Sequence, residues 1–491
     1  MVYFLILCFF AILYFKRNVH HLGLSKFDLP FAFLVKCLAG VVFIYVYFDY
    51  YGKESLCADS IAFLNQSKTL HDVFFQSPVD YLKLLTGIGE NQELVMKYLS
   101  STHHWDAGNL TLINDSKNVL RINSLIYFLS NGNEYVHIVV IAFFSTFSIY
   151  NLFISFYQET KIPQRLFFWL LVLIPSTLFW TAGILKEPFL LLGLSFFVRA
   201  LLFKDSKFKK ILFFSSGILL LLSFKPYVLL CILPALLFYG LSKRKHAFKK
   251  SILILFALAS LLFGIPKSRD YIVQHLSRKQ FDFINVGKGG IHAVADTCIY
   301  YFMPEQVANL KISDSNTVIL IRKSPAYIIE FGSSTNPIYT ELVPQKNKHW
   351  KIIYNGVKGN SYIETTYINN SFLQLLKNIP EAFINSTFRP FINDPGKNIK
   401  YSAFFEVILL VIGFTLTLFF RTELTPQKIN LIVSIFIFCL LLSLLIGFTT
   451  PVIGAIVRYR IPVYLGYFFI MTTLFNYPKF VVFLRQIRPS K

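Results

Sequence analysis

The sequence is poor in acidic residues, in cysteine and in the motifs that identify soluble enzymes. Of its 491 residues, 26 are Asp or Glu, against 48 Lys or Arg, and six are Cys. It contains no zinc-finger spacing, no P-loop, no dinucleotide-binding fingerprint and no convincing internal repeat. The chain therefore offers no sequence signal for the common nucleotide-binding and zinc-binding classes, and its function has to be inferred from other features.

Apolar residues dominate what is present. They form 55% of the chain, which has 54 phenylalanines and a mean hydropathy of +0.54. Runs of about 20 apolar residues recur, and each is long enough to cross the hydrocarbon core of a membrane. Much of the net charge of +22 lies in short segments between these runs, where it orients spans and attracts anionic lipid. We predict an all-α polytopic membrane protein, with membrane lipid but no nucleic acid as a partner.

The apolar runs predict about eleven transmembrane helices. They lie at 2–16, 29–50, 134–157, 164–183, 186–203, 211–224, 226–241, 250–266, 401–420, 428–449 and 459–477. The first run lacks a basic segment before it, and Lys16 and Arg17 follow it. We therefore interpret it as a first span rather than as a cleavable signal peptide.

Basic residues in the short loops predict the orientation of the spans. Excess Lys and Arg occur in six segments: 16–26, 158–165, 204–210, 242–250, 421–428 and the tail from Lys479. Alternation of the predicted spans places all six on one side, which the positive-inside rule makes cytoplasmic. The long segments 51–133 and 267–400 then lie on the other, non-cytoplasmic side.

This topology divides the chain into five regions. They are two N-terminal spans (1–50), a first outer loop with interfacial amphipathic helices (51–133), a central six-span bundle (134–266), a small mixed outer subdomain (267–400), and three C-terminal spans with a basic tail (401–491). The subdomain is expected to contain strands, because 317–332 reads "TVILIRKSPAYIIEFG". The stretch from Asp80 to Leu99 has apolar residues at helical spacing, which is typical of a surface helix.

Several polar residues of otherwise apolar segments converge on the predicted outer face. They are Asp59, Arg121, Lys186, Glu187, Lys225, Arg389, Arg458 and Arg460. Lys186 and Glu187 fall at the turn between two predicted crossings, and Pro188 helps to start the second helix. Arg grips phosphate oxygens with a planar fork, and Lys binds them as a point charge. A nearby carboxylate such as Asp59 suits a general base that accepts a proton from a hydroxyl.

Each of these residues also has a structural interpretation. Asp59 can be a loop carboxylate or a helix cap, Lys186 and Glu187 a local ion pair, and Lys225 an anchor that snorkels to the interface. Arg458 and Arg460 can bind lipid headgroups in general, and Arg121 and Arg389 can be structural. The functional interpretation therefore depends on the co-location of the set.

The remaining candidate ligands give weaker signals. His103, His104 and Asp106 are metal-ligand types, but two adjacent histidines face apart on most backbones, which disfavours a metal site. Cys8, Cys37, Cys231 and Cys439 lie in apolar runs and are interpreted as packing residues. Cys57 and Cys298 lie in hydrophilic segments, and the sequence leaves open whether they form a disulfide.

The order of these residues resembles that of a known family. The chain has an acidic residue in the first outer loop, then "PSTLFWTAGILKE", a "KPY" hairpin and "GAIVRYRIP". The segment "RPF" is followed by a span that contains Glu406. These segments resemble bacterial polytopic glycosyltransferases of the GT-C type and related membrane proteins of surface-polysaccharide assembly. The resemblance is scattered between Asp59 and Pro462 and is thin in 267–380.

The resemblance implies a protein of the bacterial cytoplasmic (inner) membrane, a sugar donor linked to polyprenyl phosphate, and an active face that is non-cytoplasmic. It gives Asp59 the role of base, and it gives phosphate binding to Lys186, Lys225, Arg458 and Arg460, with Arg121 and Arg389 as further candidates from their location. The family often has a second acidic residue close to the first. Both Glu54 and Glu187 fit that description, which leaves dependence on a divalent metal open and the cofactor unknown.

We therefore expect an enzyme that transfers a sugar from a polyprenyl-phosphate carrier to a glycan or protein acceptor. One alternative is an O-antigen or capsule polymerase of the Wzy kind, which also depends on outer-face arginines. Alternatives of another class are a transporter or flippase and a non-catalytic membrane subunit. A transporter is expected to have charges near the middle of its spans, whereas the notable charges here lie near the outer face. Lys36 is the exception, because it falls early in the second predicted span, near the cytoplasmic side.

Overall fold

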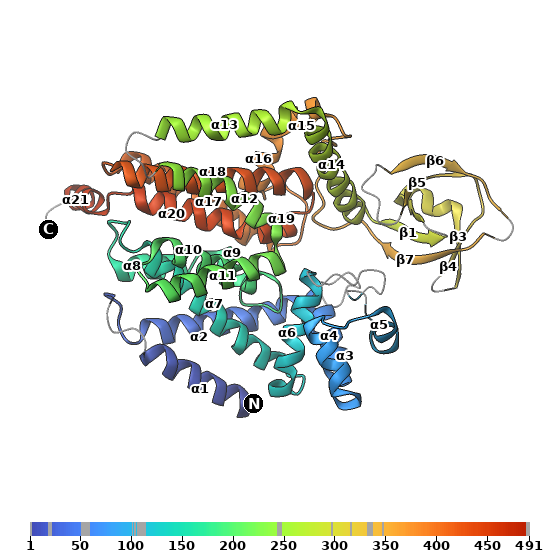
Figure 1. Cartoon of the computed structure of the whole chain (residues 1–491), viewed down its shortest axis with the longest axis horizontal. Coiled ribbons are helices and arrows are strands. Elements are labelled where there is room, and N and C mark those ends of the chain that lie inside the picture. The colour runs from blue at the N-terminus through green and yellow to red at the C-terminus, as the bar shows by residue number, and fades with distance from the viewer. Residues whose placement is uncertain are drawn as a thin grey trace. The chain divides into compact units, whose positions relative to one another are not determined.

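The protein is mostly helical and separates into two compact units (Figure 1). The computed structural model describes residues 2–17, 22–50, 59–100, 102, 105, 114–242, 248–295, 298–314, 317–330, 337–345 and 348–487. Unit 1 contains Met1–Leu236, Val411–Ile435 and Leu465–Lys491, and unit 2 contains Leu237–Leu410 and Phe436–Tyr464. Each unit is thus assembled from segments that are far apart in the sequence.

The named elements of unit 1 are all helices in its described residues. Its elements are α1 (Val2–Arg17), α2 (Asp28–Ile44), a π-helical extension η1 (Tyr45–Tyr50), α3 (Asp59–Gln76), α4 (Pro78–Thr86), α5 (Gln92–Leu99), α6 (Asp115–Ser130), α7 (Glu134–Phe156), α8 (Gln164–Val172), α9 (Pro175–Trp180), α10 (Glu187–Leu202), α11 (Lys207–Phe224) and α21 (Tyr477–Ile487). Four further helices run through both units: α12 (Pro226–Ser242), α17 (Lys400–Phe419), α18 (Pro426–Thr449) and α20 (Ile461–Leu474).

Unit 2 combines helices with one antiparallel sheet. Its helices are α13 (Phe248–Gly264), α14 (Pro266–Lys288), the 3-10 helix η2 (Pro304–Asn309), α15 (Phe372–Lys377), α16 (Ile379–Phe388) and α19 (Ile453–Tyr459). Its strands are β1 (Gly290–Ala295), β2 (Cys298–Phe302), β3 (Leu310–Asp314), β4 (Thr317–Leu320), β5 (Ser324–Glu330), β6 (Ile338–Leu342) and β7 (Trp350–Gly356), in the spatial order β3-β4-β7-β1-β2-β5-β6.

Apolar side chains cover both faces of the sheet, in two separate clusters. One face forms a core around Trp350 and Phe302, and α14 packs Phe281 against the other face. Two glycines join α14 to β1: Gly289 and Gly290 have φ angles of +83° and +107°, which only glycine adopts without strain. A Cβ on Gly289 would also lie 2.6 Å from the carbonyl oxygen of Gly356, so the junction has no room for a side chain.

Four described helices are long and apolar enough to cross a membrane. They are α2 with η1 (Asp28–Tyr50), α7 (Glu134–Phe156), α17 (Lys400–Phe419) and α18 (Pro426–Thr449). Two bent pairs raise the number to six if each pair is one span: α13 with α14, bent by 84°, and α19 with α20, bent by 52°. A helical membrane protein is compatible with this set, but the prediction of about eleven spans is wrong.

Length and charge explain why the other predicted spans fail. The predicted span 164–183 is two short helices, α8 of nine residues and α9 of six. Helices α1 and α10 have 16 residues and α12 has 17, fewer than the ~20 that a perpendicular crossing needs. Helix α11 reaches 18 residues only with Lys207, Lys209 and Lys210 included. Apolar composition alone did not distinguish buried protein helices from spans.

The amphipathic stretch between Asp80 and Leu99 is helical, as predicted. Helices α4 and α5 place Tyr81, Leu84, Val95 and Leu99 in one buried core, together with residues of α2, α3, α6 and α10. Protein side chains therefore cover these apolar positions. The β-like segment is also confirmed, because it forms β4 and β5 of the sheet.

Candidate functional site

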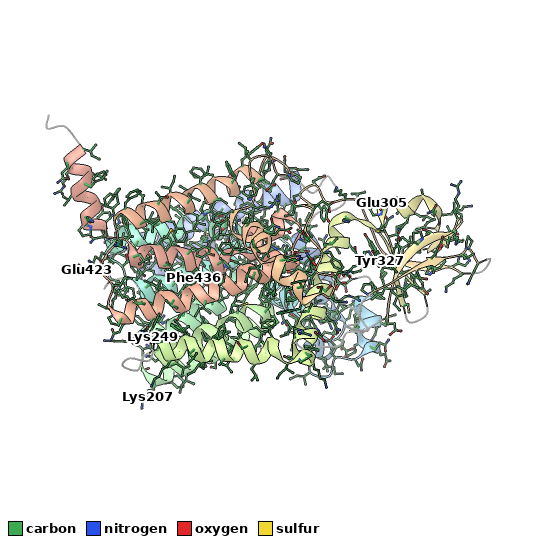
Figure 2. The ribbon with its side chains drawn as sticks, turned by 90° about the horizontal axis from the view of Figure 1, so that it is seen from above. Lys207, Lys249, Glu305, Tyr327, Glu423 and Phe436 are labelled. Atoms are coloured by element: carbon green, nitrogen blue, oxygen red, sulfur yellow. The ribbon has the colours of Figure 1, made fainter. Side chains whose placement is uncertain are left out.

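The basic loops of unit 1 gather at one end of that unit. Arg165 Nε lies 3.0 Å from Asp28 Oδ1, and a Cβ on Gly23 would contact the Gln164 side chain. Lys428 donates to the carbonyl oxygen of Glu159 at 2.7 Å. Figure 2 shows Lys207 and Glu423 at the same end of the unit. Four loops that the sequence assigned to one side are thus together, and the assignment of that side to the cytoplasm stays a prediction.

In unit 2 the basic loop and the sheet lie at opposite ends. Lys249, which belongs to the basic segment 242–250, lies at the opposite end of the unit from Tyr327 and Glu305 of the sheet region (Figure 2). The sheet is therefore far from this basic loop, as the predicted topology requires. Its location on the outer side of a membrane remains an expectation.

Charged residues of unit 1 adjoin a single apolar core where several helices begin or end. Helix α3 begins at Asp59, α6 at Asp115 and α10 at Glu187, and Lys225 separates α11 from α12. The core contains residues of α3, α6, α10 and α11 and of the segments next to Lys186 and Lys225. They are Phe63, Val119, Leu120, Leu185, Phe189 and Phe224. Each charged residue is thus within about one helical turn of a residue in that core.

Lys186 is the best-defined cation of this group. Its ammonium lies 2.8 Å from Asp115 Oδ2 and 3.0 Å from Ser116 Oγ, at the start of α6. It also lies 5.7 Å from the ring centroid of Phe63, one turn after Asp59 in α3. The side chain of Lys186 is 14% exposed and that of Asp115 is 38% exposed. The ammonium is therefore partly shielded but still borders solvent, which suits exchange of its carboxylate partner for a bound anion.

The segment before Lys186 is held by contacts with α2. Helix α9 ends at Trp180, and the chain reaches Lys186 without a regular helix. Gly183 lies against α2 so closely that a Cβ there would be 2.4 Å from the Phe43 ring. Lys36 of α2 donates to the carbonyl oxygen of Thr177 at 2.8 Å and to Thr181 Oγ1 at 2.7 Å. The Lys186–Glu187 turn is thus fixed by packing against α2, and its location at the outer face of a membrane stays a prediction.

Glu187 and Lys225 are more deeply placed. Glu187 is 1% exposed in the first turn of α10, where the helix dipole favours a negative charge. Lys225 is 5% exposed, and its ammonium lies 5.6 Å from the ring centroid of Tyr227. Both adjoin the core described above. Neither contact by itself distinguishes a functional role from a structural one.

Arg121 belongs to a buried ion cluster. Its guanidinium lies 2.8 Å from Glu90 Oε2 and donates to the carbonyl oxygen of Leu84 at 2.9 Å. Lys117 binds the other Glu90 oxygen at 2.7 Å, and Trp105 Nε1 donates to the same oxygen at 3.0 Å. Burial lowers the pKa of Arg121, and the Glu90 carboxylate opposes that shift. These contacts favour a structural role for Arg121 over phosphate binding.

The predicted arginines of unit 2 also contact protein groups. Arg460 is 0% exposed. Its guanidinium donates to the carbonyl oxygens of Ser386 and Arg389 at the end of α16. Its Nη2 lies 3.9 Å from Glu406 Oε2. Arg389 pairs with Asp394. Both arrangements favour structural roles.

Arg458 is half-buried, and its guanidinium lies 5.1 Å from the ring centroid of Tyr459. Its Nη2 also donates to the hydroxyl oxygen of Tyr459 at 3.3 Å, and a role in phosphate binding stays a prediction.

Three parts of the site were missed by sequence reasoning. Asp115 follows Asn114, whose side chain caps α6, and a cap pattern alone does not indicate a catalytic carboxylate. Glu90 and Lys117 look like ordinary loop charges until their pairing is known. The predicted ligands Glu54, Cys57, His103, His104 and Asp106 lie outside the described residues, so a second acidic residue at Glu54, a metal site and a Cys57–Cys298 disulfide remain untested.

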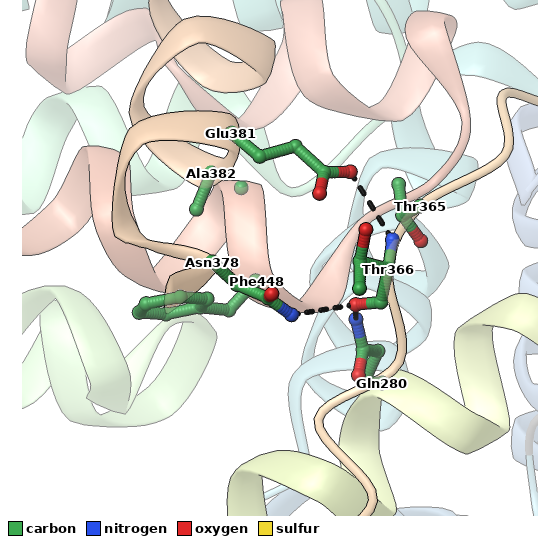
Figure 3. Close-up of a pocket in the computed structure, with 8 residues that line it drawn as sticks. Gln280, Thr365, Thr366, Asn378, Glu381, Ala382 and Phe448 are labelled. Atoms are coloured by element: carbon green, nitrogen blue, oxygen red, sulfur yellow. Dashed lines mark hydrogen bonds between the residues drawn. The ribbon is translucent and has the colours of Figure 1, made fainter. Parts of the chain in front are cut away.

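Among the residues that the structure describes, no group of three or more His, Cys, Asp or Glu side chains is placed to hold a metal ion. A small hollow in unit 2 is lined by Gln280, Thr366, Asn378, Glu381 and their neighbours (Figure 3). Glu381 and Asn378 bind the backbone of Thr366 there, and the space suits little more than a water molecule.

Comparisons of the chain with protein-family models, with curated proteins and with solved structures found no match.

Proposed function

We propose that the protein is a membrane glycosyltransferase that moves a sugar from a polyprenyl-phosphate donor to an acceptor hydroxyl. The site comprises Asp59, Asp115, Lys186 and Lys225 of unit 1. The observation that carries the proposal is the position of the Lys186 ammonium: it is partly shielded, paired with Asp115 and held beside the apolar start of α3. A phosphate joined to a long apolar chain presents the same combination of charge and apolar surface.

The helix ends add to the affinity for phosphate. Helices α3, α6 and α10 begin at Asp59, Asp115 and Glu187, and α12 begins just after Lys225. Backbone N–H groups at helix N-termini favour anions, and Lys186 and Lys225 supply full positive charges beside them. The proposal omits Arg121, Arg389 and Arg460 as phosphate ligands, because their guanidinium groups are engaged by protein partners.

The transfer step assigns roles to Asp59, Lys186 and Lys225. Asp59 accepts the proton of the acceptor hydroxyl. At the same time the oxygen of that hydroxyl attacks the anomeric carbon of the donor sugar. The bond from that carbon to the phosphate oxygen breaks, and polyprenyl phosphate departs with the electron pair. Lys186 and Lys225 stabilise the negative charge that develops on the leaving phosphate. The products are the glycosylated acceptor with inverted configuration, polyprenyl phosphate, and a proton that Asp59 releases.

Binding of the carrier is tested first. Protein in nanodiscs is titrated with polyprenyl phosphate and, as the matched control, with the same polyprenol without phosphate. The phosphate is expected to raise the unfolding temperature of the wild type, because a ligand that binds the native state stabilises it, and the alcohol is not. Lys186→Ala is expected to lose most of that shift. Lys83→Ala, which removes an exposed lysine paired with Asp80 on α4, is expected to keep it.

Chemistry is tested with Asp59→Asn, which is nearly isosteric but cannot accept a proton. Sugar transfer is expected to fall by about 10²–10⁴-fold while binding of polyprenyl phosphate is retained. Cell-surface polysaccharide profiles at matched membrane levels report the transfer. A wild-type profile with Asp59→Asn would falsify the catalytic assignment. Equal binding of the phosphate and the alcohol contradicts the proposed donor.

Two observations bear on the alternatives. A Wzy-like polymerase depends on outer-face arginines, and the engagement of Arg121, Arg389 and Arg460 by protein partners favours the transferase. A transporter is favoured by one feature: Lys36 binds carbonyl oxygens where the helical path is broken after α8 and α9, and discontinuous helices are common in transporters. Uptake of candidate solutes by proteoliposomes, with Lys36→Met as the variant, tests that alternative.

A further inference from the structure

A row of aromatic rings crosses one face of the sheet in unit 2. His292 of β1 pairs in register with Tyr301 of β2, Tyr301 with Tyr327 of β5, and Tyr327 with Tyr339 of β6. The ring centroids are 4.4, 6.3 and 4.7 Å apart along this row. Side chains at paired positions of neighbouring strands stand side by side on the same face, so the register itself aligns the rings.

The row passes from the protein interior to an open edge. Tyr301 is 0% exposed, and its hydroxyl donates to the carbonyl oxygen of Gly289 at 2.8 Å. Phe281 of α14 packs on Tyr327, with ring centroids 4.9 Å apart. Tyr339 lies on β6, the last strand of the sheet order, and is 54% exposed. The buried rings therefore hold the exposed ring in a fixed position.

Exposed polar groups flank the open end of the row. Glu341 is two residues after Tyr339 on β6, so the two side chains emerge on the same face. Its carboxylate lies 2.8 Å from the ammonium of Lys323, and both side chains are more than half exposed. An aromatic surface thus adjoins a hydrogen-bond acceptor and a hydrogen-bond donor that solvent can reach.

The charge of the sheet region restricts the class of ligand. Between Gly290 and Gly356 the chain has six Lys or Arg and five Asp or Glu residues, although the whole chain has a net charge of +22. Nucleic acids and other polyanions are bound through clustered positive charge, which this region lacks. A neutral sugar polymer has apolar C–H faces that stack on an aromatic ring and hydroxyls that both donate and accept hydrogen bonds.

We propose that Tyr339, Tyr327 and the Lys323–Glu341 pair form a binding site for a neutral polysaccharide. The exposed tyrosine provides the stacking surface, and the ion pair binds the hydroxyls of the same or the next sugar. This site is separate from the proposed transfer site and rests on none of its residues. It binds whether or not the protein transfers sugars.

The test measures binding without turnover. Full-length protein in nanodiscs is passed over immobilised laminarin, dextran and mannan, and over oligothymidylate and polyglutamate as charged polymers. At least one neutral polysaccharide is expected to bind, and Tyr339→Ala is expected to weaken that binding by about tenfold, the scale of one lost aromatic contact. Tyr339→Phe keeps the ring and is expected to retain binding. Tyr271→Ala, which removes a 62% exposed tyrosine of α14, is the matched control.

Three outcomes would overturn the proposal. They are the binding of none of the three neutral polysaccharides, binding that survives Tyr339→Ala unchanged, and binding of oligothymidylate or polyglutamate alone. Asp59→Asn is expected to leave polysaccharide binding unchanged. Loss of transfer with retained binding, or the reverse, therefore separates the failure of one proposal from the failure of the other.

Discussion

Lys36 in unit 1 and Arg460 in unit 2 are both buried cations at the end of a short helix, but their surroundings differ. Lys36 donates to the carbonyl oxygens of Thr177 and Leu178 at 2.8 and 3.4 Å, at the end of α9. Arg460 donates to carbonyl oxygens at the end of α16 and also lies 3.9 Å from the Glu406 carboxylate. In apolar surroundings the last carbonyls of a helix need donors, and a cation supplies several.

The two cations differ in whether a carboxylate lies beside them. The contacts of Lys36 with described residues are all with neutral oxygens, and Thr181 links it to Ser145 of α7 at 2.7 Å. Arg460 has a carboxylate beside it that is itself 4% exposed. Loss of the Lys36 charge removes hydrogen bonds alone, whereas loss of the Arg460 charge also leaves a buried carboxylate without that cation. The second loss is therefore expected to be larger.

Arg460→Ala is expected to have the largest effect on stability. Removal of one member of a buried charge pair typically costs about 3–5 kcal/mol, because the remaining charge stays in apolar surroundings. Unfolding of the purified protein in detergent measures the change. Combining Arg460→Leu with Glu406→Leu is expected to destabilise less than Arg460→Leu alone. A double variant as unstable as the single one shows that the carboxylate is not the source of the cost.

Lys36→Met is expected to have a smaller effect, about 1–3 kcal/mol, the cost of leaving buried carbonyls without their donors. Methionine keeps the length and the apolar contacts of the side chain. The same unfolding measurement applies, with Leu38→Met as the control, because Leu38 is 64% exposed on the same helix. If Lys36→Met destabilises more than Arg460→Ala, the comparison between the two sites is wrong.

His292 extends the comparison to a half-buried group that stays neutral. Burial lowers the pKa of His292 to about 4 from its usual 6.5. Between pH 4 and pH 6.5 the unfolded chain therefore binds a proton at His292 more readily than the folded chain does. Stability is fully present above pH 6.5 and is lost as the pH falls toward 4, by at most about 3 kcal/mol. Unfolding from pH 7.5 to 4 measures this slope.

His292→Phe is expected to flatten the slope, because phenylalanine retains a ring in the aromatic row and has no proton to bind. His275→Phe is the control, since His275 is a half-buried histidine of α14 that lies outside the sheet. A slope that is the same in His292→Phe and in the wild type assigns the pH dependence to other groups.

Long apolar runs were predicted well from the sequence. The predicted spans 29–50, 134–157, 401–420 and 428–449 correspond to helices of nearly the same bounds. These runs lack interior breaks, so local composition was sufficient. The predicted span 164–183 failed because Pro175 begins a new helix after Leu173 and Ile174. A pattern of apolar residues does not show whether lipid or protein covers a short helix.

The candidate site stays a prediction, and the structure shows only the surroundings of its residues. The sequence grouped Asp59, Lys186 and Lys225, and the structure places all three beside one core of unit 1. It did not predict that Arg121 binds Glu90, 31 residues earlier in the chain, or that Lys186 binds Asp115. Partners of this kind are set by how helices pack, and no local pattern encodes them. Any convergence of unit 1 and unit 2 residues on one cavity stays a prediction.

The sequence by itself determined that this is a helical protein with membrane-length apolar segments, where the basic loops fall, and that a strand-rich region interrupts the helices. Those properties follow from composition and period along the chain, which act over one or two helical turns or a few strand residues. Only the tertiary structure decided which charges are engaged by protein groups. The contacts of Lys36 with Thr177, of Arg460 with Glu406 and of Lys186 with Asp115 join residues far apart in sequence, and their energies depend on burial and distance, which arise only when the helices pack.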